Sequence, residues 1–517
     1  MSTLETEPRR RRGGARANPG AGGGSGLQQL PERKVQRRFA PTEIISADEL
    51  ESIHRASLKV LSEIGMDFNH PEAHALLKAA GAQIDGERVR FDPAMIEELV
   101  AHAPETFMLH ARNPAHSRVI GGNNIMYGTV GSPPNAHDME GGRRTGNRAD
   151  YQNFLRLGQY FNTINFSAGY PVEPVDIHAS IRHLDALYDM ATIMDKPLTA
   201  YVLGEERTQD ALMIAKLMRG IDDEQFHREP SVMTIVNTNS PLKLDFNMLN
   251  GMLRFCRAGQ IVCVTPFTLA GAMAPVTMAG ALVLQNAEAL AGIAFCQLVK
   301  KGAPVIYGGF TSNVDMKSGA PAFGTPEYMK AQIVGGQLAR RYKVPYRTSN
   351  TNAANTVDAQ AAYESVFSLW GLTQGGGNFI MHGAGWLEGG LVASFEKFVL
   401  DVDLIQMVTE FLQPLEINED ALGFEAIKDV GPGGHFFGTQ HTLNRYTNAF
   451  YSPLISDWRN NQQWVAAGSP DAYKKANQVY KQALNEYVKP PMDEGVHEAL
   501  KDFVERRKRE GGAPTDF

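Results

Sequence analysis

The sequence predicts an α/β protein built on a (β/α)8 barrel. Residues 260–310 hold a short apolar run, a long helical run and a second apolar run that ends at Gly308–Gly309. Two fully apolar strands joined by a helix are typical of a parallel sheet. The same alternation occurs eight times between residues 124 and 411, and eight such units in about 290 residues fit a closed barrel. An open doubly wound sheet is the alternative, but no expected strand is followed by a G-x-G-x-x-G or G-x-x-x-x-G-K-[ST] loop.

The chain before the barrel divides into two regions. Residues 1–38 are rich in glycine and carry nine Lys or Arg and three Glu, a local charge of +6. We therefore expect a disordered basic tail, either solvated or docked on an acidic surface. Residues 39–122 should form a small α+β cap. In this cap, Ser46–Glu49 is a capping box, Asp85–Gly86 marks a hairpin, and Asp92 with Pro93 opens a further helix.

The barrel itself is expected over residues 123–412. Its strands are apolar runs bounded by turn residues, and its helices carry helix formers with a buried face. The expected strands are 124–130, 163–168, 198–203, 231–237, 260–266, 304–308, 345–349 and 378–383. The expected helices are 148–160, 179–194, 205–218, 244–258, 278–300, 325–342, 358–373 and 391–411. Residues 413–517 are then a helical extension, with helices at 471–488 and 495–509.

Composition excludes several classes of protein. A net charge of −7 argues against general nucleic-acid binding, and no uninterrupted apolar run is long enough for a membrane span. The N-terminus has arginines but no apolar segment of a secretory signal. The three cysteines are isolated in apolar surroundings and form no C-x-x-C pair. Buried thiols in a reducing cytoplasm are therefore expected, and neither a disulfide framework nor a metal site.

Barrel enzymes place their active sites at the C-terminal ends of the strands. In this chain those ends carry glycines, hydroxyl groups and aromatic rings. They supply one histidine, His382, and two carboxylates, Glu173 and Glu388, with no H-x-x-x-H pair and no lysine. Hydrolytic metal chemistry and Schiff-base chemistry are therefore poorly supported.

Aromatic rings with few charges suit a quaternary ammonium ligand, which is held by π faces with an acidic group nearby. Each ring taken alone fits core or lid packing equally well, Glu388 fits a carboxylate at a helix N-terminus, and His382 fits a satisfied histidine at a strand end. The candidates are Tyr127, Tyr170, Phe310, Trp386 and Glu388.

From about Phe39 to Val488 the chain resembles the trimethylamine methyltransferase-like superfamily. The motifs that carry this resemblance are TPFTLAGAMAPVTMAGAL (265–282), YGGFTSN (307–313), DAQAAYE (358–364), HGAGWLEGG (382–390), SFEKFVLD (394–401) and VGPGGHF (430–436). The resemblance implies a TIM barrel that transfers a methyl group from a methylamine to the cobalt of a separate corrinoid protein. Members acting on trimethylamine contain pyrrolysine, whereas this chain has only ordinary residues and resembles members that demethylate quaternary amines such as glycine betaine.

Quaternary amines need little help from the protein in this reaction. The nitrogen departs as a neutral tertiary amine, so Co(I) can displace it in line without a protonating group, and positioning with exclusion of water supplies most of the acceleration. The signature D-x-H-x-x-G of corrinoid-binding proteins is absent. Asp176 and His178 match its first half, but Ile181 occupies the position of its glycine. We therefore expect no tightly bound cofactor in this chain and a docking surface for a corrinoid protein at the barrel mouth. An apolar surface on the C-terminal helices would suit a homo-oligomer, which we also expect.

The resemblance and the strand-end positions together give a set of expected roles. His382 and Glu388 are expected to be catalytic. Tyr127, Tyr170, Asn237, Phe310, Arg347 and Trp386 are expected to bind substrate, with Asn237 and Arg347 as donors to a carboxylate. Corrinoid contacts are expected at Gly308, Gly309, Gly433, Gly434 and His435, the last three in the loop 430–441. Two alternatives remain: a non-catalytic barrel that binds a quaternary amine as a sensor or partner protein, and a metal-free lyase or isomerase with His382 as base.

Overall fold

The computed structural model describes residues 26–515. The described residues form two compact units, one of residues 29–413 and 453–515, the other of residues 26–28 and 414–452. Most of the expected disordered tail, residues 1–25, lies outside the described residues. The larger unit holds the barrel, the cap and the last two helices.

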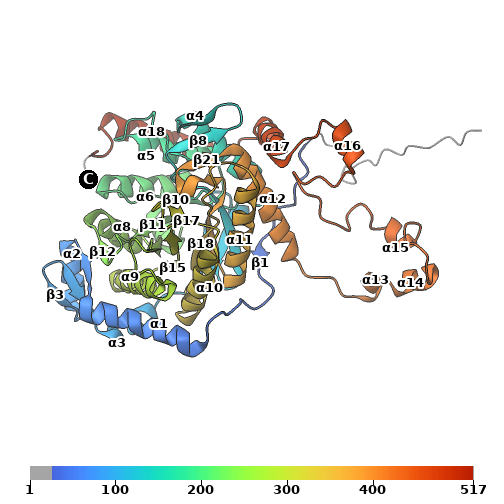
Figure 1. The fold of residues 1–517 in the computed structure, drawn as a ribbon. Coiled ribbons are helices and arrows are strands. Elements are labelled where there is room, and N and C mark those ends of the chain that lie inside the picture. The colour runs from blue at the N-terminus through green and yellow to red at the C-terminus, as the bar shows by residue number, and fades with distance from the viewer. Residues whose placement is uncertain (1–25, 516–517) are drawn as a thin grey trace, which may run out of the picture. The chain divides into compact units, whose positions relative to one another are not determined.

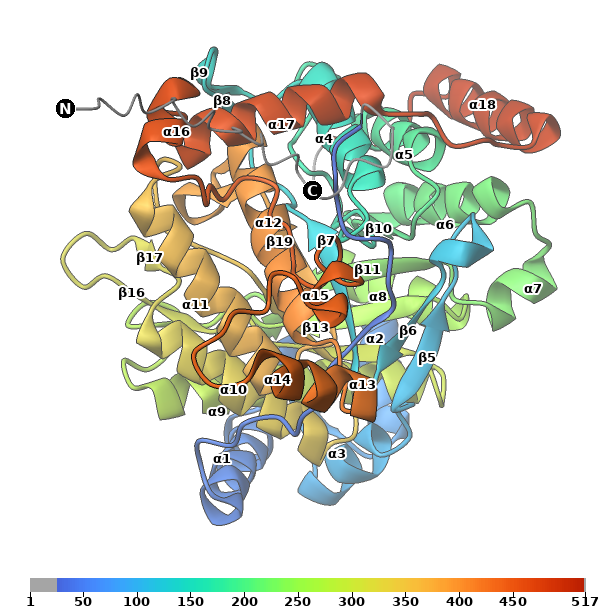
Figure 2. The same ribbon diagram turned by 90° about the vertical axis from the view of Figure 1, so that its right-hand side faces the viewer.

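Eight parallel segments close into a barrel, as the sequence predicts (Figures 1 and 2). Seven of them are hydrogen-bonded strands of one sheet, and the eighth is reduced to Phe166 and Ser167. Phe166 bridges Gly128 on one side and Ser167 bridges Leu198 on the other, so these two residues complete the ring. The sheet strands are β7 (Asn124–Thr129), β10 (Leu198–Ala200), β11 (Val232–Asn237), β13 (Ile261–Thr265), β15 (Val305–Gly308), β18 (Tyr346–Ser349) and β19 (Phe379–Ala384).

Helices follow the barrel strands at the predicted places and surround them (Figure 2). They are α4 (Arg148–Tyr160), α5 (Arg182–Ile193), α6 (Glu205–Arg219), α8 (Phe246–Arg257), α9 (Met278–Val299), α10 (Pro326–Arg341), α11 (Ala359–Gly375) and α12 (Phe395–Phe411). The start expected at residue 391 for the last helix is wrong, because β21 (Val392–Ser394) pairs with β8 (Asn135–Asp138) instead. Helix α9 is long and apolar enough to cross a membrane, but 83% of its most apolar window is buried in the protein, as in a core helix.

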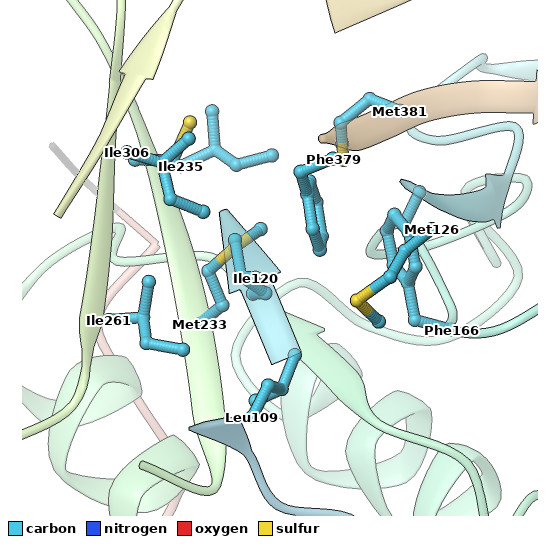
Figure 3. Close-up of a cluster of buried hydrophobic side chains, with 12 residues drawn as sticks. Leu109, Ile120, Met126, Phe166, Met233, Ile235, Ile261, Ile306, Phe379 and Met381 are labelled. Atoms are coloured by element: carbon cyan, nitrogen blue, oxygen red, sulfur yellow. The ribbon is translucent and has the colours of Figure 1, made fainter. Parts of the chain in front are cut away.

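The barrel core is continuous and closed at one end. Met126, Met233, Ile261 and Phe379 point inward from four strands (Figure 3). Leu109 and Ile120, from the hairpin β5 (Thr106–Leu109) and β6 (Arg118–Gly121), belong to the same cluster. This hairpin covers the end at which the strands begin, and barrel enzymes bind their ligands at the end at which the strands finish.

The cap also matches the prediction. Ser46 and Glu49 make the reciprocal bonds of a capping box, and Asp92 caps its helix. The cap sheet takes one strand, β12, from the barrel chain after β11. The cap elements are α1 (Ala47–Lys59), a π turn (Val60–Ile64), β2 (Met66–Phe68), α2 (Pro71–Ala79), β3 (Gln83–Asp85), β4 (Arg88–Arg90), α3 (Pro93–Val100) and β12 (Lys243–Leu244).

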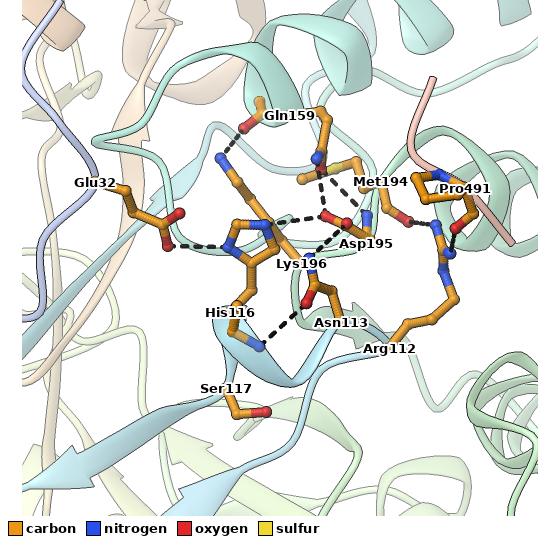
Figure 4. A network of polar contacts seen from close by, with 12 residues as sticks. Glu32, Arg112, Asn113, His116, Ser117, Gln159, Met194, Asp195, Lys196 and Pro491 are labelled. Atoms are coloured by element: carbon orange, nitrogen blue, oxygen red, sulfur yellow. Dashed lines mark hydrogen bonds and ion pairs between the residues drawn. The ribbon is translucent and has the colours of Figure 1, made fainter. Parts of the chain in front are cut away.

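Residues 29–38 were expected to be disordered, and this prediction is wrong. Strand β1 (Val35–Gln36) pairs antiparallel with the start of β7, which satisfies backbone groups that a tail would leave in water. Three residues before this strand, Glu32 contacts His116, which also contacts Asp195 beside the buried Lys196 (Figure 4). These polar contacts anchor the segment at the closed end of the barrel.

The remaining elements lie on the strand ends and the outside of the barrel. Helix α17 (Ala472–Glu486) packs against α12 and α4. Helix α18 (Glu494–Arg509) packs against α5 and α6. The others in this unit are the 3-10 turns Pro114–His116 and Glu388–Gly390, β9 (Gly142–Thr145), α7 (Asp223–Arg228), β14 (Leu269–Ala270), β16 (Ser312–Val314), β17 (Pro321–Ala322), β20 (Trp386–Leu387) and α16 (Asn461–Ala466). The expected boundary at residue 413 stays a prediction, although residues 414–452 form a unit apart.

Candidate active site at the barrel mouth

Arg347 is a buried cation inside the barrel. In the register of β18 and β19, Arg347 pairs with Phe379 and Ser349 with Met381, and both partners belong to the inward-facing core. Arg347 is 2% exposed, its guanidinium carbon lies 4.8 Å from the ring centre of Phe310, and its Nε has no hydrogen-bond partner among the described residues. A buried donor without an acceptor costs free energy, so this position is suited to an anionic group of a ligand.

His382 stands at the end of β19 as a neutral imidazole. Its Nδ1 accepts a hydrogen bond of 3.1 Å from the Gly131 backbone N–H, which places the remaining proton on Nε2. Burial, with the charge of Arg347 second, lowers the pKa of His382 well below its usual range. The residue also has φ +54°, an uncommon conformation for a side chain of this size. The structure thus holds an uncharged histidine with one free N–H at the mouth.

Aromatic rings form one wall beside these two residues. The Trp386 ring centre lies 4.3 Å from His382 and 6.2 Å from Phe310, to which it is perpendicular. The indole N–H of Trp386 donates to the Asn352 carbonyl at 3.1 Å, which fixes the plane of the ring. Phe323 extends the wall, with its ring centre 5.6 Å from that of Phe310.

A second wall comes from the first three strand ends. Tyr170 packs edge-on against Tyr201, with ring centres 5.1 Å apart, and burial raises the pKa of both hydroxyls. The Ser132 N–H donates to the Tyr170 carbonyl at 2.6 Å, and its neighbour Gly131 holds His382. The loop Gly131–Ser132 therefore connects the two walls.

A buried ion pair supports the His382–Trp386 segment from behind. Lys397 and Asp401, four residues apart on α12, are both fully buried and 2.5 Å apart. Asp401 accepts from the Gly385 N–H at 2.8 Å, and Asn350 donates to both Asp401 and the Gly383 carbonyl. This pair was not among the predicted site residues, although a lysine four residues before an aspartate on one helix is a usable signal for an ion pair.

A second carboxylate missed from the sequence fixes the loop after β11. Glu288, in the middle of α9, accepts from the Ser240 hydroxyl at 2.7 Å and the Leu242 N–H at 2.8 Å, and also contacts the Thr238 hydroxyl. Burial raises its pKa, and these three donors act in the opposite direction. Glu288 therefore shapes the loop that begins at Asn237, which is itself exposed at the end of β11.

Two further predicted residues lie elsewhere or are already engaged. Tyr127 follows Met126 in β7, and because Met126 points into the core, the alternation of a strand directs Tyr127 outward, where Thr373 of α11 lies beside its hydroxyl. The prediction that Tyr127 lines the mouth is therefore wrong. Glu388 lies near the mouth, but its carboxylate is 3.0 Å from Arg143, so it is not a free acid.

The predicted corrinoid contacts gain no geometric support. A side chain at Gly308 would lie 2.2 Å from the Thr265 hydroxyl, and one at Gly309 would lie 2.6 Å from the Tyr346 hydroxyl, so close packing against residues of neighbouring strands explains both glycines. Gly433, Gly434 and His435 belong to the separate unit 414–452. These five contacts stay predictions. Among residues 26–515, no group of three or more His, Cys, Asp or Glu is arranged to hold a metal ion.

Comparison with known proteins identifies the family. The model of the trimethylamine methyltransferase (MTTB) family matches residues 9–512. The chain belongs to this family. It is 35% identical over 470 residues to the glycine betaine methyltransferase of Desulfitobacterium hafniense, covering 91% of this chain and 98% of that protein. It is 28% identical over 473 residues to a trimethylamine methyltransferase, MttB, from the same species, covering 90% and 94%.

Solved structures support the fold. The crystal structure of the monomethylamine methyltransferase MtmB of Methanosarcina barkeri matches with a TM-score of 0.51 at 12% identity, over 89% of both chains. At this identity the match concerns the fold alone. The match agrees with the barrel that the strand pairing of this chain already establishes.

Proposed function

We propose that this family member is a methyltransferase that moves a methyl group from a betaine-type quaternary amine to the Co(I) of a separate corrinoid protein. The observation that carries this proposal is the buried Arg347 beside the ring wall of Phe310 and Trp386: its Nη1 donates to the Gly309 carbonyl at 3.5 Å, whereas its Nε has no acceptor among the described residues. The 35% identity to a glycine betaine methyltransferase over nearly its full length supports the same substrate class.

The charges at the mouth favour a zwitterion over a simple cation. A trimethylammonium group has no N–H to donate and binds π faces, at about 0.5–2 kcal/mol for each ring. Arg347 would repel such a group unless the same ligand also offered a carboxylate. Glycine betaine carries both charges, with one methylene group between the quaternary nitrogen and the carboxylate, and a neutral His382 adds no repulsion.

The chain's own groups then bind and orient the substrate. Arg347 would take the carboxylate, the rings of Trp386 and Phe310 the trimethylammonium group, and the Nε2–H of His382 a polar atom of the ligand. When the corrinoid protein docks, its cobalt supplies the electron pair for the methyl group. The C–N bond breaks with its electron pair staying on nitrogen, so a neutral tertiary amine leaves and no proton moves. Positioning and exclusion of water are therefore the contributions expected from this chain.

This reaction also explains the state of His382. A base whose pKa lies well below 6.5 is a poor proton acceptor at neutral pH, which counts against a lyase or isomerase using His382 as base. In methyl transfer from a quaternary amine, a neutral hydrogen-bond donor is sufficient. We further propose a cytoplasmic location and a role in one-carbon metabolism.

The test is to incubate the protein with glycine betaine and chemically reduced cobalamin and follow dimethylglycine by proton NMR. The proposal predicts that one dimethylglycine forms for each reduced cobalamin that is methylated. No dimethylglycine should form in the mixture that lacks the protein. Tight betaine binding without dimethylglycine, even when corrinoid proteins are supplied, would instead identify a non-catalytic binding protein. Choline and carnitine in the same assay define the substrate class.

A further inference from the structure

Residues 414–452, which we call the arm, expose an unusual amount of apolar surface. The arm contains three short helices, α13 (Glu419–Leu422), α14 (Phe424–Val430) and α15 (Gln440–Leu443). All of its residues are described, and Ala426 is the single apolar side chain among them that is buried. Its exposed large apolar residues are Leu415, Ile417, Leu422, Phe424, Ile427, Phe436, Phe437, Leu443, Tyr446 and Phe450.

The arm has no core of its own. A segment of this length cannot bury enough apolar surface to fold alone, yet it forms regular capped helices. Phe437 is 78% exposed and Phe450 is 89% exposed. Using about 150–250 Å² for an aromatic side chain, the ten residues together expose on the order of 1,000 Å². Apolar patches larger than a few hundred Å² mark surfaces that another protein covers.

A second apolar surface lies on two helices of the barrel. Tyr363, Val366 and Phe367 are exposed on one face of α11, three and four residues apart. Met407 and Phe411 are exposed on α12, one turn apart, and α12 packs beside α11. We call these five side chains the α11–α12 face.

We propose that the arm packs on the α11–α12 face of a second copy of this chain, and that the second copy returns the same contact. This inference is independent of the proposed reaction. Two reciprocal contacts about a two-fold axis cover both apolar surfaces of each copy in a closed assembly. Counting both arms and both receiving faces, such an interface exceeds roughly 2,000 Å², the size typical of obligate homodimers.

The arm begins where helix α12 ends. Helix α12 runs from the mouth back to the closed end, because it follows the C-terminal end of β19. Near its last turn, Glu410 pairs with Arg33 at 2.8 Å, in the segment that anchors at the closed end. The chain enters the arm directly after this turn.

Mass measurement tests the proposal first. Light scattering of the wild-type chain should give at least twice 56.7 kDa, about 113 kDa. The variant L415S/F424S/F437S/F450S should fall to 56.7 kDa with an unchanged far-UV circular dichroism spectrum, because none of these side chains is buried in one copy. The control I44S/I64S/V488S, which removes exposed apolar residues elsewhere, should keep the wild-type mass. A monomeric wild type, or an arm variant that keeps its full mass, would overturn the proposal.

Cross-linking then distinguishes a second copy from the same chain. One tagged chain carries Phe437→Cys and a differently tagged chain carries Tyr363→Cys; the native cysteines are all buried and do not react with a bifunctional maleimide under native conditions. The proposal predicts cross-links that join the two tags. If cross-links form only within a single chain carrying both cysteines, the arm folds back on its own barrel and the proposal is wrong.

Discussion

Replacing Arg347 by methionine should invert the ligand preference of the site. Arg347 is already buried and lacks an acceptor for its Nε, so the cost of burying its charge has been met during folding. A carboxylate that arrives there gains nearly the full interaction, about 2–4 kcal/mol for a buried charge-assisted pair. Losing it should weaken glycine betaine binding roughly 30- to 1,000-fold.

Choline should respond in the opposite direction. It carries the trimethylammonium group without the carboxylate, so in the wild type it experiences only repulsion from Arg347. At about 6 Å and an effective dielectric constant between 20 and 80, that repulsion is roughly 1–3 kcal/mol. Arg347→Met should therefore bind choline more tightly than the wild type does.

Isothermal titration calorimetry with both ligands measures this crossover. Arg37→Met is the matched control, because Arg37 is equally buried, also has unpaired guanidinium nitrogens and lies at the closed end of the barrel. It should leave both affinities unchanged. Arg347→Met should also unfold at a higher temperature, since it removes a buried charge without a partner. Unchanged betaine affinity, or an equal loss for both ligands, would refute the role of Arg347 as the carboxylate donor.

Three other variants test the surrounding structure. Trp386→Leu should weaken betaine binding about 5- to 30-fold by calorimetry, whereas Trp464→Leu, whose indole also donates to a backbone carbonyl, should not. Lys397→Met should lower the free energy of unfolding in urea by about 3–5 kcal/mol and should also weaken betaine binding. Lys196→Met, at the closed end of the barrel, should lower the free energy of unfolding without changing betaine affinity. Burial lowers the pKa of His116, but its hydrogen bonds to two carboxylates raise that pKa overall. In the wild type, His116 therefore stabilises the fold below about pH 6.5, and this contribution is lost as the pH rises. His116→Gln should remove this pH-dependent part of the free energy of unfolding. An unchanged affinity in the first two variants, or an unchanged pH profile in the third, would contradict these assignments.

The barrel could be predicted because its signals are local and repeated. Each buried strand is a short apolar run, and most barrel helices begin after a capping residue, such as Asp245 before α8 or Thr277 before α9. The errors arose where pairing between distant segments decides the structure. Residues 392–394 lie beside β8 and form a strand, and residues 35–36 find an open position beside β7.

The site was harder to predict because it depends on side-chain direction. Tyr127 looked like a mouth residue from its place near a strand end, but the parity of the strand turns it toward α11. The same alternation along β18 directs Arg347 and Ser349 into the barrel, so it supports these two residues as site residues. Asp401 and Glu288 hold the site through contacts with residues 16 to 51 positions away in the chain, and no local pattern in the sequence reveals which loops they contact.

The central claim is that a betaine lies at the mouth of the barrel with its two charges separated between Arg347 and the ring wall. A crystal structure of the protein with glycine betaine tests this directly. The account predicts the carboxylate within hydrogen-bond distance of the Arg347 guanidinium and the quaternary nitrogen within about 6 Å of the Trp386 ring centre. A betaine bound with its carboxylate turned away from Arg347, or bound outside the mouth, would contradict it.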